Sequence, residues 1–245
     1  PLRAPGSNAL SFVMQSFIDE LAHAAGKDPL QFRIDLLGDQ EFVQNADGRD
    51  KYEVGRMRRV LEAARERSGW GTRKLPKGTG LGVGFHFSHL GYFATVAEVS
   101  VDAAKRVKVN RCWCVGDVGR QIINPGGAEQ QVQGSVLDAL SEALGQEITI
   151  DKGRAVEGNF AAFPLLRLRQ APPVDVSWVR SDNPPTGIGE PALPPSVPAI
   201  TNAICLRMDR RLSGLAKRFG FRYTRYADDL TFSWRPSPEP AEGKT

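Results

Sequence analysis

Three consecutive runs of the sequence, residues 80–89, 92–101 and 107–115, alternate apolar and polar positions or are continuously apolar. A period of two is that of a β-strand, in which successive side chains point to opposite faces. Leu90-Gly91 and residues 102–106 separate the runs, and such short connections join antiparallel neighbours. The pattern therefore predicts a three-stranded meander.

Helical periodicity dominates the rest of the chain. Apolar residues spaced three and four apart predict helices near residues 7–25, 28–37, 53–67 and 128–144, and a further strand is expected at 174–179. Because helices and strands mix without a regular βαβ alternation, the predicted fold class is α+β.

The first of these helices is expected to bury its apolar stripe. A cap at Ser7 or Asn8 and a stop at Gly26 set its ends. The residues of the predicted buried face are Leu10, Val13, Met14, Phe17, Ile18 and Leu21.

Composition places the chain among globular proteins. Of its 245 residues 41% are hydrophobic, which is enough for a sizeable core in one or two domains. No apolar run approaches the ~20 residues that span a bilayer, and no signal-peptide pattern opens the sequence. We expect a bacterial cytoplasmic protein, with the periplasm as the alternative. The three cysteines, which we expect to be reduced thiols, are Cys112, Cys114 and Cys205.

The formal charge of +4 is concentrated near the C-terminus. Residues 205–235 contain eight Lys or Arg and three Asp, whereas the remainder of the chain is close to neutral. An electrostatic argument for a nucleic-acid partner therefore applies only to this segment.

Residues 186–205 read T-G-I-G-E-P-A-L-P-P-S-V-P-A-I-T-N-A-I-C. Gly187 and Gly189 allow close approach of the backbone to another group, and Glu190, directly before Pro191, presents one carboxylate from a stiff loop. This arrangement suits a general base. The alternative is a solvated glutamate in a Pro/Gly turn.

Two other groups of polar residues have functional alternatives. Gln131 and its neighbours occupy the first turns of the helix at 128–144, where free N–H groups and side-chain amides suit a phosphate or a pterin edge, although a solvated helix start has the same composition. His86 and His89 are three residues apart, which suits neither a metal site on a strand nor a catalytic pair, so we interpret both as structural.

Several separated motifs then occur in order: P-L-R-A-P-G-S-N-A at residues 1–9, K-D-P-L-Q-F-R at 27–33, I-I-N-P-G-G at 122–127, Q-V-Q-G at 131–134 and G-I-G-E-P at 187–191. Together they resemble the C-terminal part of a molybdenum hydroxylase large subunit, of the isoquinoline 1-oxidoreductase beta type within the xanthine dehydrogenase and aldehyde oxidase family. The resemblance covers residues 1–204.

The resemblance implies hydroxylation of an aldehyde or N-heterocycle carbon with oxygen from water, by a molybdenum cofactor of the molybdopterin dinucleotide type. Glu190 takes the role of the catalytic base. The residues assigned to the cofactor side are Arg3, Gln131, Gly134 and Gly189. The implied partners are a small-molecule substrate, an upstream molybdopterin domain and an iron–sulfur electron-transfer subunit. Without them we expect the chain to be incomplete and inactive.

A second resemblance begins inside the first one. Residues 198–235, with Y-A-D-D at 226–229, resemble the palm of a bacterial retron-type or group II intron reverse transcriptase. That resemblance implies a hairpin with strands at 221–224 and 230–234. It also implies that Asp228 and Asp229 hold Mg²⁺ ions for the transfer of nucleotides to a growing nucleic-acid strand.

The resulting hypothesis is a chimera in three parts. Residues 1–204 form the cofactor domain, 205–235 a helix and Y-A-D-D hairpin, and 236–245 a disordered tail. The open alternatives for function are a hydroxylase fragment, a nucleic-acid enzyme and a non-catalytic remnant.

Overall fold

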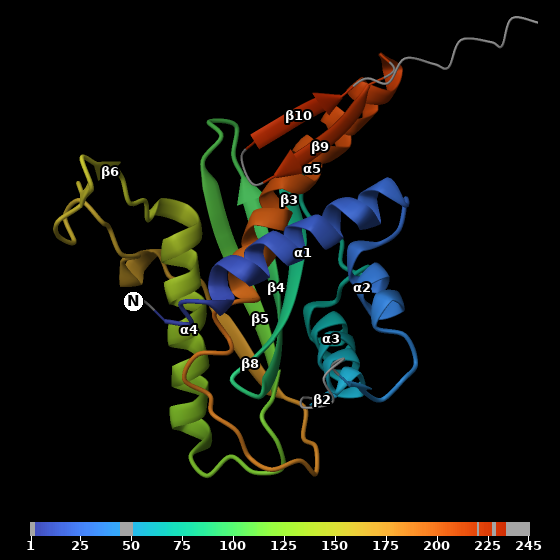
Figure 1. Cartoon of the computed structure of the whole chain (residues 1–245), viewed down its shortest axis with the longest axis vertical. Coiled ribbons are helices and arrows are strands. Elements are labelled where there is room, and N and C mark those ends of the chain that lie inside the picture. Colours follow the sequence, from blue (N-terminus) through green and yellow to red (C-terminus); the bar gives the residue numbers. More distant parts are fainter. Residues whose placement is uncertain (1–2, 45–50, 220, 227–228, 234–245) are drawn as a thin grey trace, which may run out of the picture.

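The computed structural model describes residues 3–44, 51–219, 221–226 and 229–233. Its centre is a four-stranded sheet of order β3-β4-β5-β8 (Figure 1). The strands are β3 (Thr79–Ser88), β4 (Gly91–Val101), β5 (Val107–Asp117) and β8 (Val174–Trp178). The first three form an antiparallel meander, and β8 runs parallel to β5. The predicted meander and the α+β class are confirmed.

Helices cover both faces of the sheet. Alternation along β5 places Cys112 and Cys114 in one core and Trp113 and Val115 in the other. The first core lies against α4 (Pro125–Gly145) and α5 (Ser196–Arg218), and the second against α3 (Val54–Ser68) and α2 (Pro29–Leu37). Figure 1 shows α3 and α4 on opposite sides of the sheet. The structure thus has three layers, helices on sheet on helices.

Two glycines of β3 bring α5 into direct contact with the sheet. A Cβ atom on Gly82 would lie 2.1 Å from the carbonyl oxygen of Ala199, and one on Gly84 would lie 2.4 Å from that of Pro195. Real Cβ atoms do not approach other atoms so closely. The first turns of α5 can therefore lie flat on β3 only because these two positions carry no side chain.

The burial expected for the first helix is wrong. In α1 (Ser7–Ala24) the apolar residues Leu10, Met14, Phe17 and Leu21 are 40–58% exposed, and Gly6 rather than Ser7 or Asn8 is the N-cap. The buried residues are Ser11, Gln15, Ser16, Asp19 and Ala22.

A buried arginine explains this orientation of α1. Arg33 of α2 is fully buried, and its guanidinium donates to Gln15 Oε1 at 2.9 Å and to Asp19 Oδ1 at 3.0 Å. A buried cation must be paired, so the polar face of α1 turns inward to meet it. The apolar stripe then points away from the sheet.

The C-terminal part continues directly from the domain. Helix α5 crosses position 204/205 without a break, and β9 (Arg222–Tyr226) pairs with β10 (Asp229–Ser233), with Tyr226 opposite Asp229. The predicted hairpin is confirmed, and in Figure 1 it lies beyond the end of the sheet. Asp228 and residues 236–245 lie outside the described residues.

Short elements complete the chain: β1 (Val43–Gln44), β2 (Lys51–Tyr52), β6 (Ile150–Asp151), β7 (Arg154–Ala155) and the 3₁₀ helix η1 (Leu168–Gln170). Cys112 and Cys114 are buried, and the three cysteines form no disulfide with one another in the described part of the chain. Within the described ranges, no helix is both long and apolar enough to cross a membrane.

Candidate functional site

The loop that leads into α5 holds Glu190 at the edge of the core. Thr186 N–H donates to the Val118 carbonyl at 2.9 Å, and Leu193 N–H donates to the Glu190 carbonyl at 3.1 Å. Ala192 and Leu193 are fully buried directly after it. The Glu190 side chain itself is 41% exposed. The loop is thus fixed on both sides while its carboxylate faces outward.

Helix α4 lies beside this loop. Asn124 caps the helix by accepting from Gly127 N–H at 3.0 Å, and Pro125 occupies its first position. Two turns later the Gln131 side-chain amide donates to the Gly189 carbonyl oxygen, with a donor–acceptor distance of 3.4 Å. The contact brings together two predicted site residues that are 58 positions apart in the sequence.

Arg3 contacts the same face of α4. Its Nη1 donates to Ser135 Oγ at 2.9 Å and forms an ion pair with Asp138 Oδ2 at 3.0 Å. A Cβ atom on Gly134 would lie 3.6 Å from Arg3 Nη1, an ordinary contact distance, so the guanidinium lies directly beside the helix here. Residues 131, 134, 135 and 138 share one helix face because they are spaced by three and four. Arg3, Gln131, Gly134 and Gly189 thus gather along α4.

His89 is a residue that sequence reasoning missed. Its Nε2 lies 2.8 Å from Glu190 Oε2, and the two side chains are 47% and 41% exposed. His89 and Leu90 form the two-residue turn between β3 and β4, with φ angles of +52° and +63°. Leu rarely adopts such angles, whereas His does so more often than most residues. His-Leu is not one of the usual turn dipeptides, so the sequence carries little signal of the turn that aims the imidazole at the carboxylate.

A buried ion pair anchors the chain segment that leads into the 186–190 loop. Arg56 of α3 donates to both carboxylate oxygens of Asp117, from Nε at 2.9 Å and from Nη2 at 2.8 Å. Asp117 also accepts from Gly119 N–H and from Ser181 Oγ, each at 2.9 Å. Burial alone would raise the pKa of Asp117, but these hydrogen bonds outweigh it and lower that pKa. Asp117 thus joins the end of β5 to the chain that leads into the 186–190 loop.

The residues present fit a large polar cofactor. The Gln131 side chain is exposed beside Gly189, and a Cβ on Gly187 would meet nothing within 4 Å, so the loop leaves open space there. The buried side-chain oxygens of Ser88, next to His89, and of Thr186, at the start of the loop, have no hydrogen-bond partner among the residues that the structure describes. Unpaired buried hydroxyls and exposed amides suit a group rich in oxygen and nitrogen.

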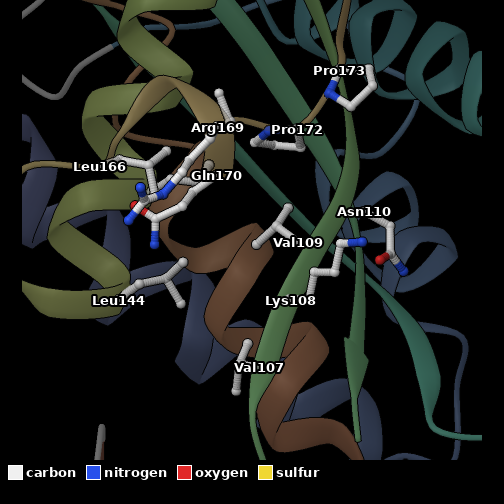
Figure 2. Close-up of a pocket in the computed structure, with 12 residues that line it drawn as sticks. Val107, Lys108, Val109, Asn110, Leu144, Leu166, Arg169, Gln170, Pro172 and Pro173 are labelled. Carbon is white, nitrogen blue, oxygen red and sulfur yellow. The ribbon is translucent and has the colours of Figure 1, made fainter.

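A separate cavity lies away from these residues. A cavity of about 450 Å³ opens between η1, the start of β5 and the C-terminal half of α4. In Figure 2, Val109 and Leu144 face it from opposite sides, and Lys108 and Asn110 lie on the side of β5 away from Arg169. None of the predicted site residues lines this cavity.

Comparison with known proteins identifies the family. The sequence profile of the molybdopterin cofactor-binding domain matches residues 8–172. The chain belongs to the molybdopterin cofactor-binding domain family of the molybdenum hydroxylases.

The similar proteins are much longer than this chain. It is 31% identical over 229 residues to the membrane-bound aldehyde dehydrogenase [pyrroloquinoline-quinone] of Gluconacetobacter polyoxogenes, covering 89% of the chain and 29% of that protein. It is 28% identical over 220 residues to isoquinoline 1-oxidoreductase subunit beta of Brevundimonas diminuta, covering 89% of the chain and 26% of that protein. The chain thus spans less than a third of either relative.

A solved structure shares the fold. Aldehyde oxidoreductase from Desulfovibrio gigas superposes with a TM-score of 0.60 at 14% identity, over 84% of this chain and 39% of that one. The likeness confirms the architecture of a molybdenum hydroxylase cofactor domain.

The second resemblance is also confirmed, over a shorter stretch. The chain is 60% identical over 60 residues to the retron Mx162 reverse transcriptase of Myxococcus xanthus, which is 23% of the chain and 12% of that enzyme. Asp229 begins β10, and Asp228 lies outside the described residues. Within the described part of the chain, no group of three or more His, Cys, Asp or Glu residues is placed to hold a metal ion.

Proposed function

We propose that the chain supplies one side of the active site of a molybdenum hydroxylase and that Glu190 is its catalytic base. The observation that carries the proposal is the state of the Glu190 carboxylate. Its backbone is held by a buried turn and its Oε2 by His89, while among the described residues Oε1 takes part in no hydrogen bond. A base needs one positioned oxygen that is free to accept a proton.

In this proposal, the residues of the chain have separate roles. Glu190 Oε1 accepts the proton lost by the water-derived nucleophile that attacks an aldehyde or N-heterocycle carbon. Gln131 and the backbone at Gly189 would hold a molybdenum cofactor of the dinucleotide type by hydrogen bonds from α4 and its neighbouring loop. Arg3 holds the exposed face of α4 at Gly134. The bound cofactor supplies the centre that takes two electrons from the substrate carbon–hydrogen bond.

Activity also needs parts that the relatives carry outside the matched segment. The chain covers 29% and 26% of the two relatives, so we expect the rest of a subunit to complete the pocket and an iron–sulfur subunit to remove the electrons. The chain alone is expected to be inactive.

A segment exchange tests the proposal. Residues 1–204 replace the matching segment of the Brevundimonas diminuta subunit, and the molybdenum and pterin content and the oxidation of an N-heterocycle are measured. The chimeric subunit should hold molybdenum, and Gln131→Ala should lower its molybdenum content. Gln133→Ala is the control and should not lower it, because the Gln133 amide donates to Glu129 on α4. Molybdenum content that does not respond to the loss of Gln131 contradicts the cofactor assignment.

We propose nucleotidyl transfer by the C-terminal part as a second candidate, because of its 60% identity to a retron reverse transcriptase and the observed hairpin. Asp228 and Asp229 would hold Mg²⁺ at the hairpin turn. Magnesium-dependent primer extension that Asp228→Asn abolishes and Asp209→Asn leaves intact would support it. No extension by the wild-type chain would exclude it.

We propose that the boundary between the two parts lies at 204/205, although α5 continues through it. In the first turns of α5, Ala199, Ile200 and Ala203 are buried in the core on one face of the sheet. Limited trypsin digestion should therefore cut between Arg218 and Arg225 before it cuts ahead of Pro198. Equal protection of both regions would place them in one folding unit.

A further inference from the structure

The turn between β3 and β4 has a backbone that its residues do not favour. Ser88 pairs with Gly91, so His89 and Leu90 are the two central residues of the hairpin loop. Both have positive φ, +52° and +63°, as the tightest β-hairpin turns require. Asn-Gly is the usual solution, because both residues adopt the left-handed region readily. His is also tolerated there, but Leu90 is strained. Among the described residues, this is the one place where two successive non-glycine residues have positive φ.

A gain in folding stability does not explain why residue 89 is a histidine. Positive φ at two non-glycine residues destabilises the folded chain, and such outliers gather at functional sites. The ion pair that His89 makes is half exposed, and exposed pairs contribute little to stability. A turn of Asn-Gly would serve the hairpin better, so the imidazole has another role.

The turn aims the imidazole at one atom. His89 Nε2 lies 2.8 Å from Oε2 of Glu190, 101 positions later in the sequence. Gly91, the residue that follows the turn, lies against the same loop, since a Cβ atom on it would be 3.1 Å from Pro191 Cγ. The hairpin and the Glu190 loop therefore hold each other at two adjacent points.

We infer that His89 is a positioning residue for Glu190. The Nε2–H group donates to Oε2 and fixes the rotation of the carboxylate, so that Oε1 faces the site as the oxygen that accepts the proton. The inference rests on the proposed role of Glu190 as base. It also assigns a function to a turn whose backbone is unfavourable for its residues.

Imidazole ¹⁵N NMR of the full chain tests the contact without any cofactor. The chain has three histidines, so His89→Gly identifies the His89 signals by their loss. With Glu190 present, the shifts should report a proton on Nε2 as the dominant form. Glu190→Ala should move the Nε2 shift to that of an imidazole bonded only to water, and Glu190→Gln, which keeps an acceptor oxygen, should restore most of the wild-type shift. Identical His89 shifts in the wild-type chain and in Glu190→Ala would overturn the inference.

The exchanged subunit described above tests the role in turnover. His89→Gly removes the donor and relieves the backbone, whereas Leu90→Gly relieves the same turn and leaves the donor. We expect His89→Gly to lower kcat about tenfold with KM unchanged, as for loss of orientation at a base, and His89→Asn to recover part of the loss. Leu90→Gly should match the parent. Equal kcat values for His89→Gly and Leu90→Gly would overturn the inference.

The two proposals fail in different ways. If Glu190→Gln leaves turnover intact, the proposed base is wrong, whatever the NMR spectra show. If Glu190→Gln abolishes turnover and His89→Gly does not, only the positioning role is wrong.

Discussion

A methyl group at residue 82 should separate α5 from the sheet. In Gly82→Ala the new Cβ would lie 2.1 Å from the Ala199 carbonyl oxygen and 2.4 Å from the Ala203 nitrogen. Both are backbone atoms of α5, which no side-chain rotation can move. Since carbon and oxygen pack at roughly 3.5 Å, the helix must shift by more than ~1 Å. The shift would also move the Glu190 loop that leads into α5.

The expected change in unfolding free energy is the cost of the steric clash minus the gain from replacing a strand glycine with alanine. Overpacking of a core costs roughly 1–3 kcal/mol, and backbone contacts place this site at the upper end, ~3 kcal/mol. Replacing a strand glycine with alanine returns about 0.5–1 kcal/mol, because the unfolded chain loses freedom. The net loss of unfolding free energy should be about 2 kcal/mol. Gly80→Ala is a matched control on the same strand, because its Cβ would lie 3.4 Å from the Ala203 oxygen, an ordinary contact.

Urea denaturation of the three chains, followed by far-ultraviolet circular dichroism, measures the difference. Gly82→Ala should have a lower midpoint with a similar slope. Gly80→Ala should be about 0.5–1 kcal/mol more stable than the wild type, because it has the gain of the alanine without the clash. If the two variants were equally stable, the direct packing of α5 on β3 would be refuted.

Three other predictions concern buried groups. Asp117→Asn should lower the unfolding free energy by about 3 kcal/mol, because Arg56 loses its buried carboxylate partner and keeps only the more exposed Glu53. Asp102→Asn, at an exposed pair with Arg106, should change it by less than ~0.5 kcal/mol in the same urea assay. Burial, with a smaller contribution from His89, lowers the pKa of His86 to about 4. As the pH falls, the unfolded chain therefore binds the extra proton first. The stability contribution is fully present above about pH 6.5 and falls by about 3 kcal/mol as the pH drops toward 4. His86→Gln should flatten this part of a stability–pH curve. Burial raises the pKa of Cys114 to about 12 and raises that of Cys112 further, so a thiol reagent at neutral pH should leave both unmodified until urea unfolds the chain.

The sheet and the helices could be predicted because periodicity reports them locally. Strands β3, β4 and β5 begin and end within two residues of the runs read from the sequence. The orientation of α1 could not be predicted in this way. Its apolar stripe suggests burial, but Arg33 requires Gln15 and Asp19 as partners, and this requirement spans two helices.

The candidate site, too, could be predicted from the sequence only in part. The motif containing Glu190 was identified by its order among other motifs, and the contact between Gln131 and Gly189 follows from the fold alone. His89 was assigned a structural role because its spacing from His86 suits no site. Its actual partner is a carboxylate 101 positions away, reached through a turn that His-Leu does not predict.

The most direct test of the account is the kcat of Glu190→Gln in the exchanged subunit, measured per molybdenum atom. Glutamine keeps the shape of the side chain and an acceptor for His89 but cannot take up the proton at neutral pH. If Glu190 is the base, molybdenum content should stay unchanged while kcat falls by about 100- to 10,000-fold. A kcat within about twofold of the parent at equal molybdenum content would contradict the account, because so small a loss lies far below the contribution of a general base.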